Sequence, residues 1–355
     1  MRIVVVGVGL IGGSIGLAAQ ARLGAEVVGV DADAGALARA RQRGAVSRAA
    51  GDLDEALAGA EIVFLATPVG ALAELQVAAL AAAPPDCVVS DVGSTKRTLA
   101  GVEDERFVGG HPLAGAETAG VEHARADLFE GATWYLTPGP RTSGVLYERL
   151  HRALSALGAQ PAAIDPATHD RLMATVSHLP HVLANVLVGQ AAQELRQGGE
   201  AMPATGPSFR DATRVAGANR AIWTDIYLSN RDALLERLEE TVSQLTAFAD
   251  ALRRADVEAV AGFSERAAAD RQALQESGLS GGPLLELRAS VPNRPGVIAD
   301  IALALGRAGV NIVDLALSPS PDFTRGVVAL WVRGEENARR ALELIGELEI
   351  AVTRA

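Results

Sequence analysis

Apolar and polar positions follow two different patterns along the chain, and the first of these fills the first half. There, short β-branched or apolar runs alternate with stretches of helical pattern. The predicted strands cover residues 3–6, 27–30, 62–66, 88–90 and 107–110. Strands that alternate with helices indicate βαβ units and a parallel sheet, in which ligands bind at the carboxyl ends of the strands. Residues 1–163 are therefore predicted to form an open α/β domain.

The second pattern begins after about residue 163, where strand signals almost disappear. The predicted helices cover residues 166–197, 222–255 and 257–276. Helices of this length usually pack against a large surface, often that of a second subunit. We expect an all-α domain over residues 164–276.

A Gly- and Ser-rich segment separates this helical part from a compact C-terminal unit. Residues 277–283 have the composition of a linker. Beyond it the patterns run strand, helix, strand, strand, helix, strand, which is the βαββαβ order of a ferredoxin-like domain. Residues 283–355 are predicted to form this third domain, and the fold class of the whole chain is α/β.

Composition and charge narrow the classes of function. The 355 residues suffice for two or three domains, and 49% of them are hydrophobic. The formal net charge of −11 argues against nucleic acid as the main partner, because phosphate binding needs a basic surface. The first apolar run leads into a Gly-rich turn, unlike a signal peptide, and no run reaches the roughly 20 apolar residues that span a bilayer. A cytoplasmic protein without a membrane partner is predicted.

Cysteine and histidine usage argues against a metal centre. Cys87 is the single cysteine, which excludes an internal disulfide and any multi-cysteine metal site. It lies in an apolar run and is predicted to be a buried, inert thiol. His178 and His181 lie close together, but no His-Glu-x-x-His pattern or suitably spaced carboxylate completes a site. No metal is predicted.

A Gly-rich motif follows the first predicted strand and opens a helix. Its residues are Gly7-Val8-Gly9-Leu10-Ile11-Gly12. Gly7 permits a tight turn, Gly9 a close approach to a pyrophosphate, and Gly12 close packing of helix on strand. The helix N-terminus offers free N–H groups to the phosphates, and Ser14 can add a hydroxyl. This context predicts a Rossmann-type dinucleotide-binding domain over residues 1–163.

Asp31 ends the next predicted strand and indicates which dinucleotide is bound. Its carboxylate is expected to accept hydrogen bonds from the adenosine ribose and to repel a 2′-phosphate. No arginine follows it directly, so NAD is favoured over NADP. Asp31 as the N-cap of the following helix is an alternative that is compatible with this role. The rest of the cofactor groove is expected to include Thr67, Pro68, Asp91 and Gly93, although simple loop chemistry would also explain these residues.

Two histidine-containing clusters are candidates for catalysis. His111 follows a predicted strand on the cofactor side, and histidine is the common general base near neutral pH. Ser177 and His181 flank Pro180, which kinks a helix, and their spacing places them on one helical face. His178 lies about 100° round the helix from Ser177 and is expected to be structural.

A third cluster contains Asp211 and Arg214, followed by Trp223. An Asp and an Arg close together often form only a solvated face. An arginine oriented by nearby acids is also the way in which proteins build a carboxylate-binding fork.

In combination these motifs resemble the prephenate/arogenate dehydrogenase family of tyrosine biosynthesis. The matching stretches are residues 7–14, 91–96, 110–117, 177–181 and 211–214 with Trp223, which occur in the expected order. The resemblance implies an NAD-dependent oxidative decarboxylation, in which a hydride and CO2 leave a cyclohexadienol ring that becomes aromatic. It also implies a homodimer formed through the helical domain.

The resemblance assigns roles to individual residues. His111 matches the catalytic base, Ser94 matches a serine that supports it, and Arg214 matches the arginine that binds a substrate carboxylate. The positions that match the pocket lining and a gate around this arginine are Ser177, His181, Glu117, Asp211 and Trp223.

Residues 291–298 and 309–312 resemble an ACT domain, a module that binds amino acids and regulates enzymes. The resemblance predicts an effector site at Asn293, Gly296, Asn311 and Ile312, with tyrosine as the candidate effector. A module that only assists assembly is the alternative.

Two other interpretations of the whole chain remain. A hydroxyacid dehydrogenase would be expected to need a catalytic lysine in the helical half, and residues 166–275 contain no lysine. A non-catalytic amino-acid sensor would not need the His111, Ser94 and Arg214 set. The sequence leaves open whether prephenate or arogenate is preferred, since the two differ only by a keto or an amino group.

Overall fold

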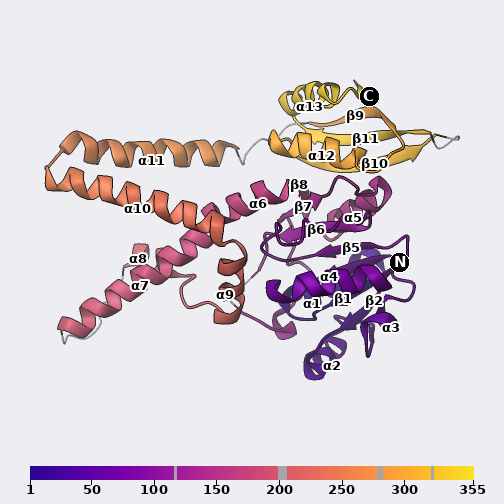
Figure 1. Cartoon of the computed structure of the whole chain (residues 1–355), viewed down its shortest axis with the longest axis horizontal. Helices are drawn as coiled ribbons and strands as arrows, with labels where there is room; N and C mark the ends of the chain where they lie inside the picture. The colour runs from indigo at the N-terminus through magenta and orange to yellow at the C-terminus, as the bar shows by residue number, and fades with distance from the viewer. Residues whose placement is uncertain (116–117, 199–205, 278–282, 321–323) are drawn as a thin grey trace. The chain divides into compact units, whose positions relative to one another are not determined.

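The computed structural model describes residues 1–355 except 116–117, 199–205, 278–282 and 321–323 (Figure 1). The described chain forms two compact units. The first unit comprises Met1–Asp170, Asn219–Ser229 and Leu284–Ala355. The second comprises Arg171–Ala218 and Asn230–Pro283.

An eight-stranded sheet forms the centre of the first unit, with strand order β3-β2-β1-β4-β5-β6-β7-β8. The strands are β1 (Arg2–Val6), β2 (Glu26–Val30), β3 (Arg48–Ala49), β4 (Ile62–Leu65), β5 (Val88–Asp91), β6 (Phe107–Pro112), β7 (Thr133–Pro138) and β8 (Gln160–Ala163). Strands β1 to β6 are parallel, which confirms the predicted βαβ units, whereas β7 runs antiparallel to β6. The strand order reverses between β1 and β4, which is the point where open sheets of this class bind ligands.

Both faces of this sheet are buried, as expected for parallel strands. Side chains alternate along each strand, so Ile3 and Val5 join one apolar cluster while Val4 and Val6 join another. The helices of this domain are α1 (Leu10–Leu23), α2 (Ala34–Gln42), α3 (Leu53–Leu57), α4 (Val69–Ala82) and α5 (Gly144–Ala156), with a 3-10 turn at Val121–His123. Cys87 is fully buried, and burial raises the pKa of its thiol to about 12, which fits the predicted inert thiol.

The middle of the chain is helical, as predicted. Its helices are α6 (Pro166–Met173), α7 (Leu179–Gly198), α8 (Pro207–Thr213), α9 (Arg220–Ser229), α10 (Arg231–Arg253) and α11 (Val257–Ser277), with a π-helical turn at Ala174–His178. The helix predicted over residues 222–255 is interrupted at Asn230. Because of this break, α9 belongs to the first unit and packs on α4. There the Asp225 carboxylate accepts a hydrogen bond from the Gly70 amide at 3.3 Å.

One helical stretch meets the length and hydropathy of a membrane span, which the sequence pattern did not predict. Among the described residues this is Pro166–Glu194, with a mean hydropathy of 1.3. The stretch contains His169, Asp170, His178 and His181, all buried within the protein. Ionisable groups are costly in a lipid interior, so these four residues argue against a membrane span here.

The C-terminal domain has the predicted βαββαβ order. Its elements are β9 (Leu284–Pro292), α12 (Val297–Arg307), β10 (Ile312–Pro319), β11 (Arg325–Arg333), α13 (Glu335–Glu347) and β12 (Ala351–Arg354). The strands form an antiparallel sheet in the order β10-β11-β9-β12.

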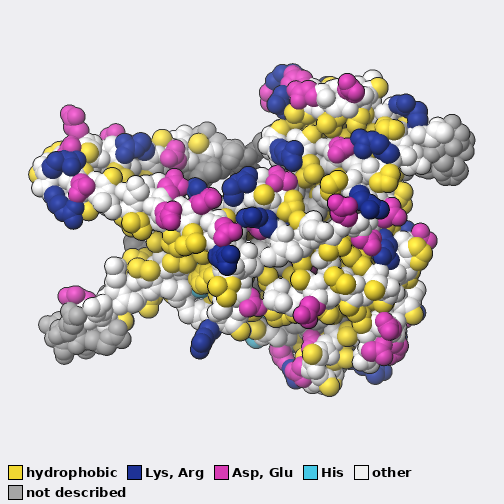
Figure 2. Space-filling model, in the orientation of Figure 1, with side chains coloured by type: hydrophobic (Ala, Val, Ile, Leu, Met, Phe, Trp, Pro, Cys, Tyr) yellow, Lys and Arg dark blue, Asp and Glu magenta, His cyan; other side chains and the backbone are white. Residues whose placement is uncertain are grey.

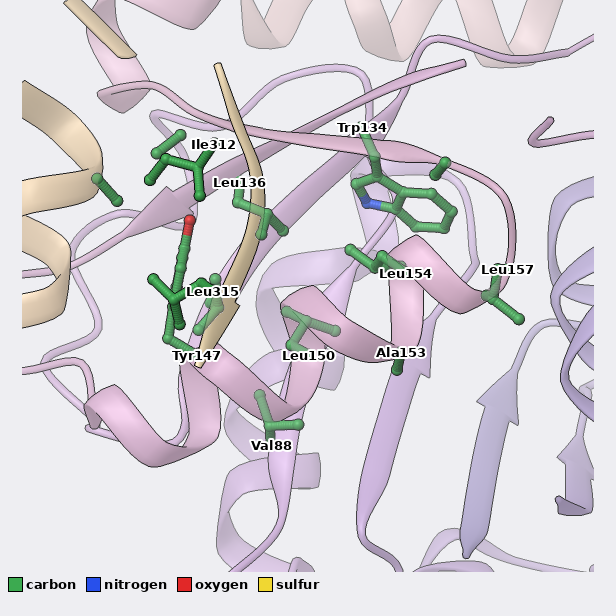
Figure 3. Close-up of a cluster of buried hydrophobic side chains, with 14 of the residues drawn as sticks. Val88, Trp134, Leu136, Tyr147, Leu150, Ala153, Leu154, Leu157, Ile312 and Leu315 are labelled. Atoms are coloured by element: carbon green, nitrogen blue, oxygen red, sulfur yellow. The ribbon is translucent and has the colours of Figure 1, made fainter. Parts of the chain in front are cut away.

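This C-terminal domain packs on the N-terminal domain within the first unit. Ile312 and Leu315 of β10 join Tyr147 and Leu150 of α5 in one buried cluster (Figure 3). His151, on the same helix, is fully buried, and the backbone of Ile312 and the carboxylate of Asp314 face it. The joint is therefore a packed apolar interface that also buries the His151 ring.

Candidate active site

The Gly-rich loop after β1 is shaped to hold a dinucleotide. Gly7 has a φ of 93°, and a Cβ atom there would lie 2.5 Å from the Ala66 carbonyl oxygen, so only glycine fits this turn. A Cβ at Gly12 would lie 1.9 Å from the Gly7 carbonyl oxygen. At Gly9 no atom comes within 4 Å of the equivalent position, which leaves the backbone open to a phosphate. The α1 N-terminus begins there and supplies N–H groups.

Asp31 lies at the end of β2, next to this loop. Its carboxylate accepts hydrogen bonds from the Val8 and Asp33 amides, both at 2.8 Å. The N-cap of α2 is Asp33, whose carboxylate accepts from the Gly35 amide at 2.8 Å. The capping role that was an alternative for Asp31 thus belongs to Asp33, and Asp31 is held beside the loop.

Two other predicted cofactor residues take part in the framework of the fold. Ser14 is fully buried, and its hydroxyl oxygen accepts a hydrogen bond from the Arg125 amide at 3.0 Å. Asp91 is also fully buried and forms an ion pair with Lys96. The Asp91 carboxylate further accepts from the Gly93 amide at 2.7 Å and the Gly110 amide at 3.1 Å.

Thr67 lies two residues after the end of β4, on the same side of the sheet. Its hydroxyl oxygen is buried and has no hydrogen-bond partner. A buried polar atom of this kind is costly unless a ligand or water satisfies it. The open backbone at Gly9, the oriented Asp31 carboxylate and this hydroxyl together fit an NAD molecule.

Lys96 connects the carboxyl ends of β5 and β6 beside the predicted catalytic residue. Its ammonium group binds Asp91 and donates to the Gly110 carbonyl oxygen at 2.6 Å. Burial lowers the pKa of Lys96, and the Asp91 carboxylate opposes that shift. The pair therefore fixes the residue immediately before His111.

His111 lies at the end of β6 and contacts a second histidine that the sequence analysis did not single out. The His111 Nδ1 atom is 2.9 Å from His169 Nε2, and His169 Nδ1 is 2.8 Å from Asp170 Oδ1. His169 and Asp170 are fully buried. The Asp170 carboxylate also accepts from the Lys96 and Arg97 amides at 2.8 and 3.0 Å.

This chain of contacts determines which ring nitrogens carry protons. Burial lowers the pKa of His169, although its hydrogen bond to Asp170 acts in the opposite direction, so the neutral ring is favoured. The ionised Asp170 accepts the Nδ1 proton of His169, whose Nε2 then accepts the Nδ1 proton of His111. In this tautomer the Nε2 atom of His111 carries no proton and can act as a base. The only sequence signal for this arrangement was the adjacent His169-Asp170 pair at the start of α6.

Ser94 lies in the turn after β5, partly buried and two residues before Lys96. It thus shares a short turn with the backbone amides that hold Asp170. Trp223 is partly buried on α9 in the same unit, and its ring lies 5.5 Å from that of Tyr227. Glu117 lies outside the described residues.

The other predicted substrate residues belong to the second unit. Ser177 lies in the π-helical turn, a distortion that often marks functional sites. His181 is buried, and burial lowers the pKa of its ring while a backbone contact with Val215 opposes that shift. The unit therefore brings His181 next to the segment that carries Arg214. Arg214 and Asp211 are both exposed.

The surroundings of His178 lie within the second unit. His178 is buried, and its Nδ1 atom lies 3.1 Å from the Asn230 side-chain nitrogen. In the described part of the chain, no three His, Cys, Asp or Glu side chains form a group that could hold a metal ion.

The predicted effector residues have different surroundings. Asn293 is exposed and lines a cavity between the N- and C-terminal domains, and Asn311 is exposed. Ile312 is buried against α5. The Gly296 amide donates to the Thr142 carbonyl oxygen of the N-terminal domain at 2.9 Å.

Comparisons with known proteins match all three parts of the chain. Residues 15–162 match the family described as prephenate dehydrogenase, nucleotide-binding domain, and residues 165–265 match its dimerization domain. Residues 286–348 match the ACT domain. A prephenate dehydrogenase of Bacillus subtilis is 30% identical over 354 residues, which cover 97% of this chain and 95% of that protein.

Two solved structures are similar to about three quarters of this chain. Synechocystis arogenate dehydrogenase is 29% identical with a TM-score of 0.67, covering 77% of this chain and 100% of that one. Prephenate dehydrogenase from Aquifex aeolicus, in complex with hydroxyphenyl propionate and NAD+, is 26% identical with a TM-score of 0.70. That match covers 77% of this chain and 98% of the other.

Proposed function

The chain belongs to the prephenate dehydrogenase family, and on that premise we propose that it converts prephenate to 4-hydroxyphenylpyruvate with NAD, in tyrosine biosynthesis. The observation that carries the proposal is the oriented His111, which lies at the carboxyl end of β6 in the same sheet as the Gly7–Gly12 loop. A non-catalytic sensor would have no use for a histidine with a defined tautomer.

The protein's part in the reaction is to hold the substrate and to move one proton. NAD, when bound, supplies the acceptor for the hydride from the ring carbon that carries the hydroxyl. His111 Nε2 takes the hydroxyl proton as that hydride leaves. The ring carboxylate then departs as CO2, its bonding electrons make the ring aromatic, and the phenolate oxygen regains a proton. His169 and Asp170 stabilise the positive charge that His111 acquires.

We assign the cofactor to the loop at Gly7 and Gly9 and to Asp31. An ionised Asp31 disfavours the 2′-phosphate of NADP, so NAD is the cofactor. Thr67 contributes its hydroxyl from the end of β4. Ser14 and Asp91 support the loop and the strand ends from inside the fold.

The substrate's two carboxylates require cationic or hydrogen-bonding groups. We assign one carboxylate to Arg214, because a guanidinium binds a carboxylate through two hydrogen bonds. Further substrate contacts are assigned to Ser177 and His181, support of His111 to Ser94, and a gate around Arg214 to Asp211, Trp223 and Glu117.

A homodimer and a cytoplasmic location complete the proposal. Large apolar side chains are exposed on the second unit, and hydrophobic atoms gather over α7 and α10 on the face seen in Figure 2. The exposed residues include Val186, Leu187 and Val188 of α7 and Leu235, Val242 and Leu245 of α10. Patches of this kind mark association surfaces, and residues 165–265 match a dimerization domain.

We further propose that the C-terminal domain regulates the enzyme by binding an amino acid, with tyrosine as the feedback inhibitor. The match to the ACT domain supports this role. The proposal fails if tyrosine changes neither the rate nor the thermal stability of the intact enzyme.

The test of the reaction is NAD reduction, followed by absorbance, with prephenate and with arogenate. Turnover of prephenate supports the proposal. Arogenate is the second candidate because the Synechocystis relative of similar fold is an arogenate dehydrogenase. Activity with arogenate alone would change the substrate and leave the chemistry intact, and inactivity with both would overturn the proposal.

A further inference from the structure

Tyr135 of β7 lies directly opposite His111 of β6 in this antiparallel pair of strands. Residues paired in this way have their side chains on the same face of the sheet, with Cβ atoms roughly 4.5–5.5 Å apart. The neighbours on either side along β7, Trp134 and Leu136, point to the other face and join the buried cluster beside α5 (Figure 3). The Tyr135 ring therefore lies on the face of the sheet that carries the His111 ring.

The ring of His169 packs against both of these side chains. Its centroid lies 5.1 Å from that of His111 and 5.7 Å from that of Tyr135. Both pairs meet edge to face, with interplanar angles of 71° and 83°, an arrangement that aromatic rings prefer. We propose that Tyr135 is a positioning residue for the reaction: its ring covers and orients His169 and, through it, the base His111. The inference rests on the proposed dehydrogenase reaction and adds a residue outside the predicted site.

Tyr135 supplies part of the cover that keeps water away from His169. The His169 side chain is fully buried, whereas the Tyr135 side chain that contacts it is only partly buried. Burial lowers the pKa of His169 below its ordinary value of 6.5. A shorter side chain at position 135 would admit water, which favours the charged ring and raises that pKa. The Tyr135 ring therefore helps to keep His169 neutral.

The charged groups that face His169 act on the same pKa in both directions. The hydrogen bond and the negative charge of Asp170 raise it, as does Asp91, whereas the Lys96 ammonium lowers it. Tyr135 contributes no charge at neutral pH, because burial raises the pKa of its hydroxyl. Its effect on His169 is therefore expected to come from the ring and not from the hydroxyl.

The contact with His111 requires a neutral His169. The Nε2 atom of His169 can accept the Nδ1 proton of His111 only while it carries no proton itself. Protonation of His169 would set two N–H groups against each other across 2.9 Å and release the His111 ring. The orientation of the base would then be lost as the pH falls. By keeping His169 neutral, Tyr135 extends to lower pH the range in which His111 is oriented.

Two variants separate the ring of Tyr135 from its hydroxyl. Tyr135→Phe keeps the ring and removes the hydroxyl, whereas Tyr135→Thr removes the ring and introduces a β-branched side chain, which a strand favours. The pKa of His169 is measured by NMR of the full chain with carbon-13-labelled histidine, without substrate, and His169→Gln assigns the signal. We expect this pKa to be unchanged in Tyr135→Phe and to rise toward 6.5 in Tyr135→Thr.

NAD reduction, with the substrate that the wild type turns over, gives the second readout. Tyr135→Thr is expected to lower kcat at neutral pH by about tenfold or more, the usual effect of losing an outer partner, and to leave KM for that substrate within about twofold. As the pH is lowered, its kcat should fall at a higher pH than that of the wild type, because His169 is protonated earlier. Tyr135→Phe is the matched control and should keep both the wild-type kcat and its pH dependence.

Two results would overturn the inference. In the first, Tyr135→Thr folds, as its melting temperature shows, but leaves the pKa of His169 unchanged. In the second, Tyr135→Phe loses as much activity as Tyr135→Thr, which would assign the hydroxyl to a direct contact with the substrate. If Tyr135→Thr does not fold, Tyr135→Val decides the question by the same measurements. The NMR titration needs no turnover, so an inactive wild type would overturn the proposed function and leave this test in place.

Discussion

The Nδ1 atom of His111 lies 2.9 Å from the Nε2 atom of His169, so the predicted base is oriented by another histidine. Asp170 completes the chain of contacts and is itself held by two backbone amides. Since His169 and Asp170 are fully buried, neither histidine ring can turn without breaking a hydrogen bond inside the protein. The orientation of His111 is therefore a property of the fold and does not depend on bound substrate.

Replacing the base itself tests its role directly. His111→Asn is expected to lower kcat by about 10²-fold or more, the size of a general-base contribution. Binding of NAD, measured by calorimetry, is expected to stay within about twofold, because the cofactor contacts lie elsewhere. His123→Gln, at an exposed histidine, is the control. A variant with unchanged kcat would remove His111 from the mechanism.

Replacing Asp170 tests whether the chain of contacts selects the tautomer of His111. In Asp170→Asn, a side-chain amide that donates to His169 reverses the direction of both hydrogen bonds. We expect kcat to fall by roughly 10- to 100-fold, the usual effect of losing an outer partner. Nitrogen-15 NMR of the ring should show His111 protonated at Nδ1 in the wild type at neutral pH, and at Nε2 in the variant. A loss of activity with an unchanged tautomer would indicate a merely structural role.

Asp31 provides a test of cofactor choice. The double variant Asp31→Asn with Ala32→Arg removes the negative charge and supplies a cation for a 2′-phosphate. We expect KM for NAD to rise about tenfold and NADP to become the better cofactor. Asp33→Asn is the matched control, since Asp33 caps α2. An unchanged preference in the double variant would show that Asp31 does not contact the ribose.

Because His151 is buried in the joint between the N- and C-terminal domains, we expect acid to lower the stability of the protein. Burial lowers the pKa of this ring from 6.5 to about 4, although the Asp314 carboxylate opposes the shift. Between pH 6.5 and about 4, the His151 ring binds a proton in the unfolded chain but not in the folded protein. The stability of the folded protein therefore falls as the pH is lowered through this range. That difference amounts to at most about 3 kcal/mol.

The measurement is the melting temperature of wild type and of His151→Phe between pH 7.5 and 4, in steps of about half a pH unit. The variant has no ring to protonate, so its melting temperature should fall less over this range. His123→Gln is again the control and should follow the wild type. Identical pH profiles for wild type and His151→Phe would contradict the prediction.

The sequence by itself determined the features that arise from neighbouring residues. The βαβ alternation, the Gly7–Gly12 turn, the acid at Asp31 and the βαββαβ order of the C-terminal domain are all periodic or local patterns. Backbone geometry and short-range packing produce them, so a pattern of a few residues is enough to predict them. The pattern also placed His111 at the carboxyl end of a strand, although the strand runs two residues further than predicted and includes His111.

The tertiary structure decided which side chains meet. His111 and His169 are 58 residues apart, and Thr95 and Ser229, which join α9 to the first unit, are 134 apart. Contacts between residues so far apart produce no periodic pattern in the sequence, because they depend on how the intervening elements pack. The same reason explains why Asp91 and Ser14 proved to be buried framework residues and why Gly296 contacts Thr142. Local chemistry identified these residues as notable, and only the packing of distant segments determined the role of each.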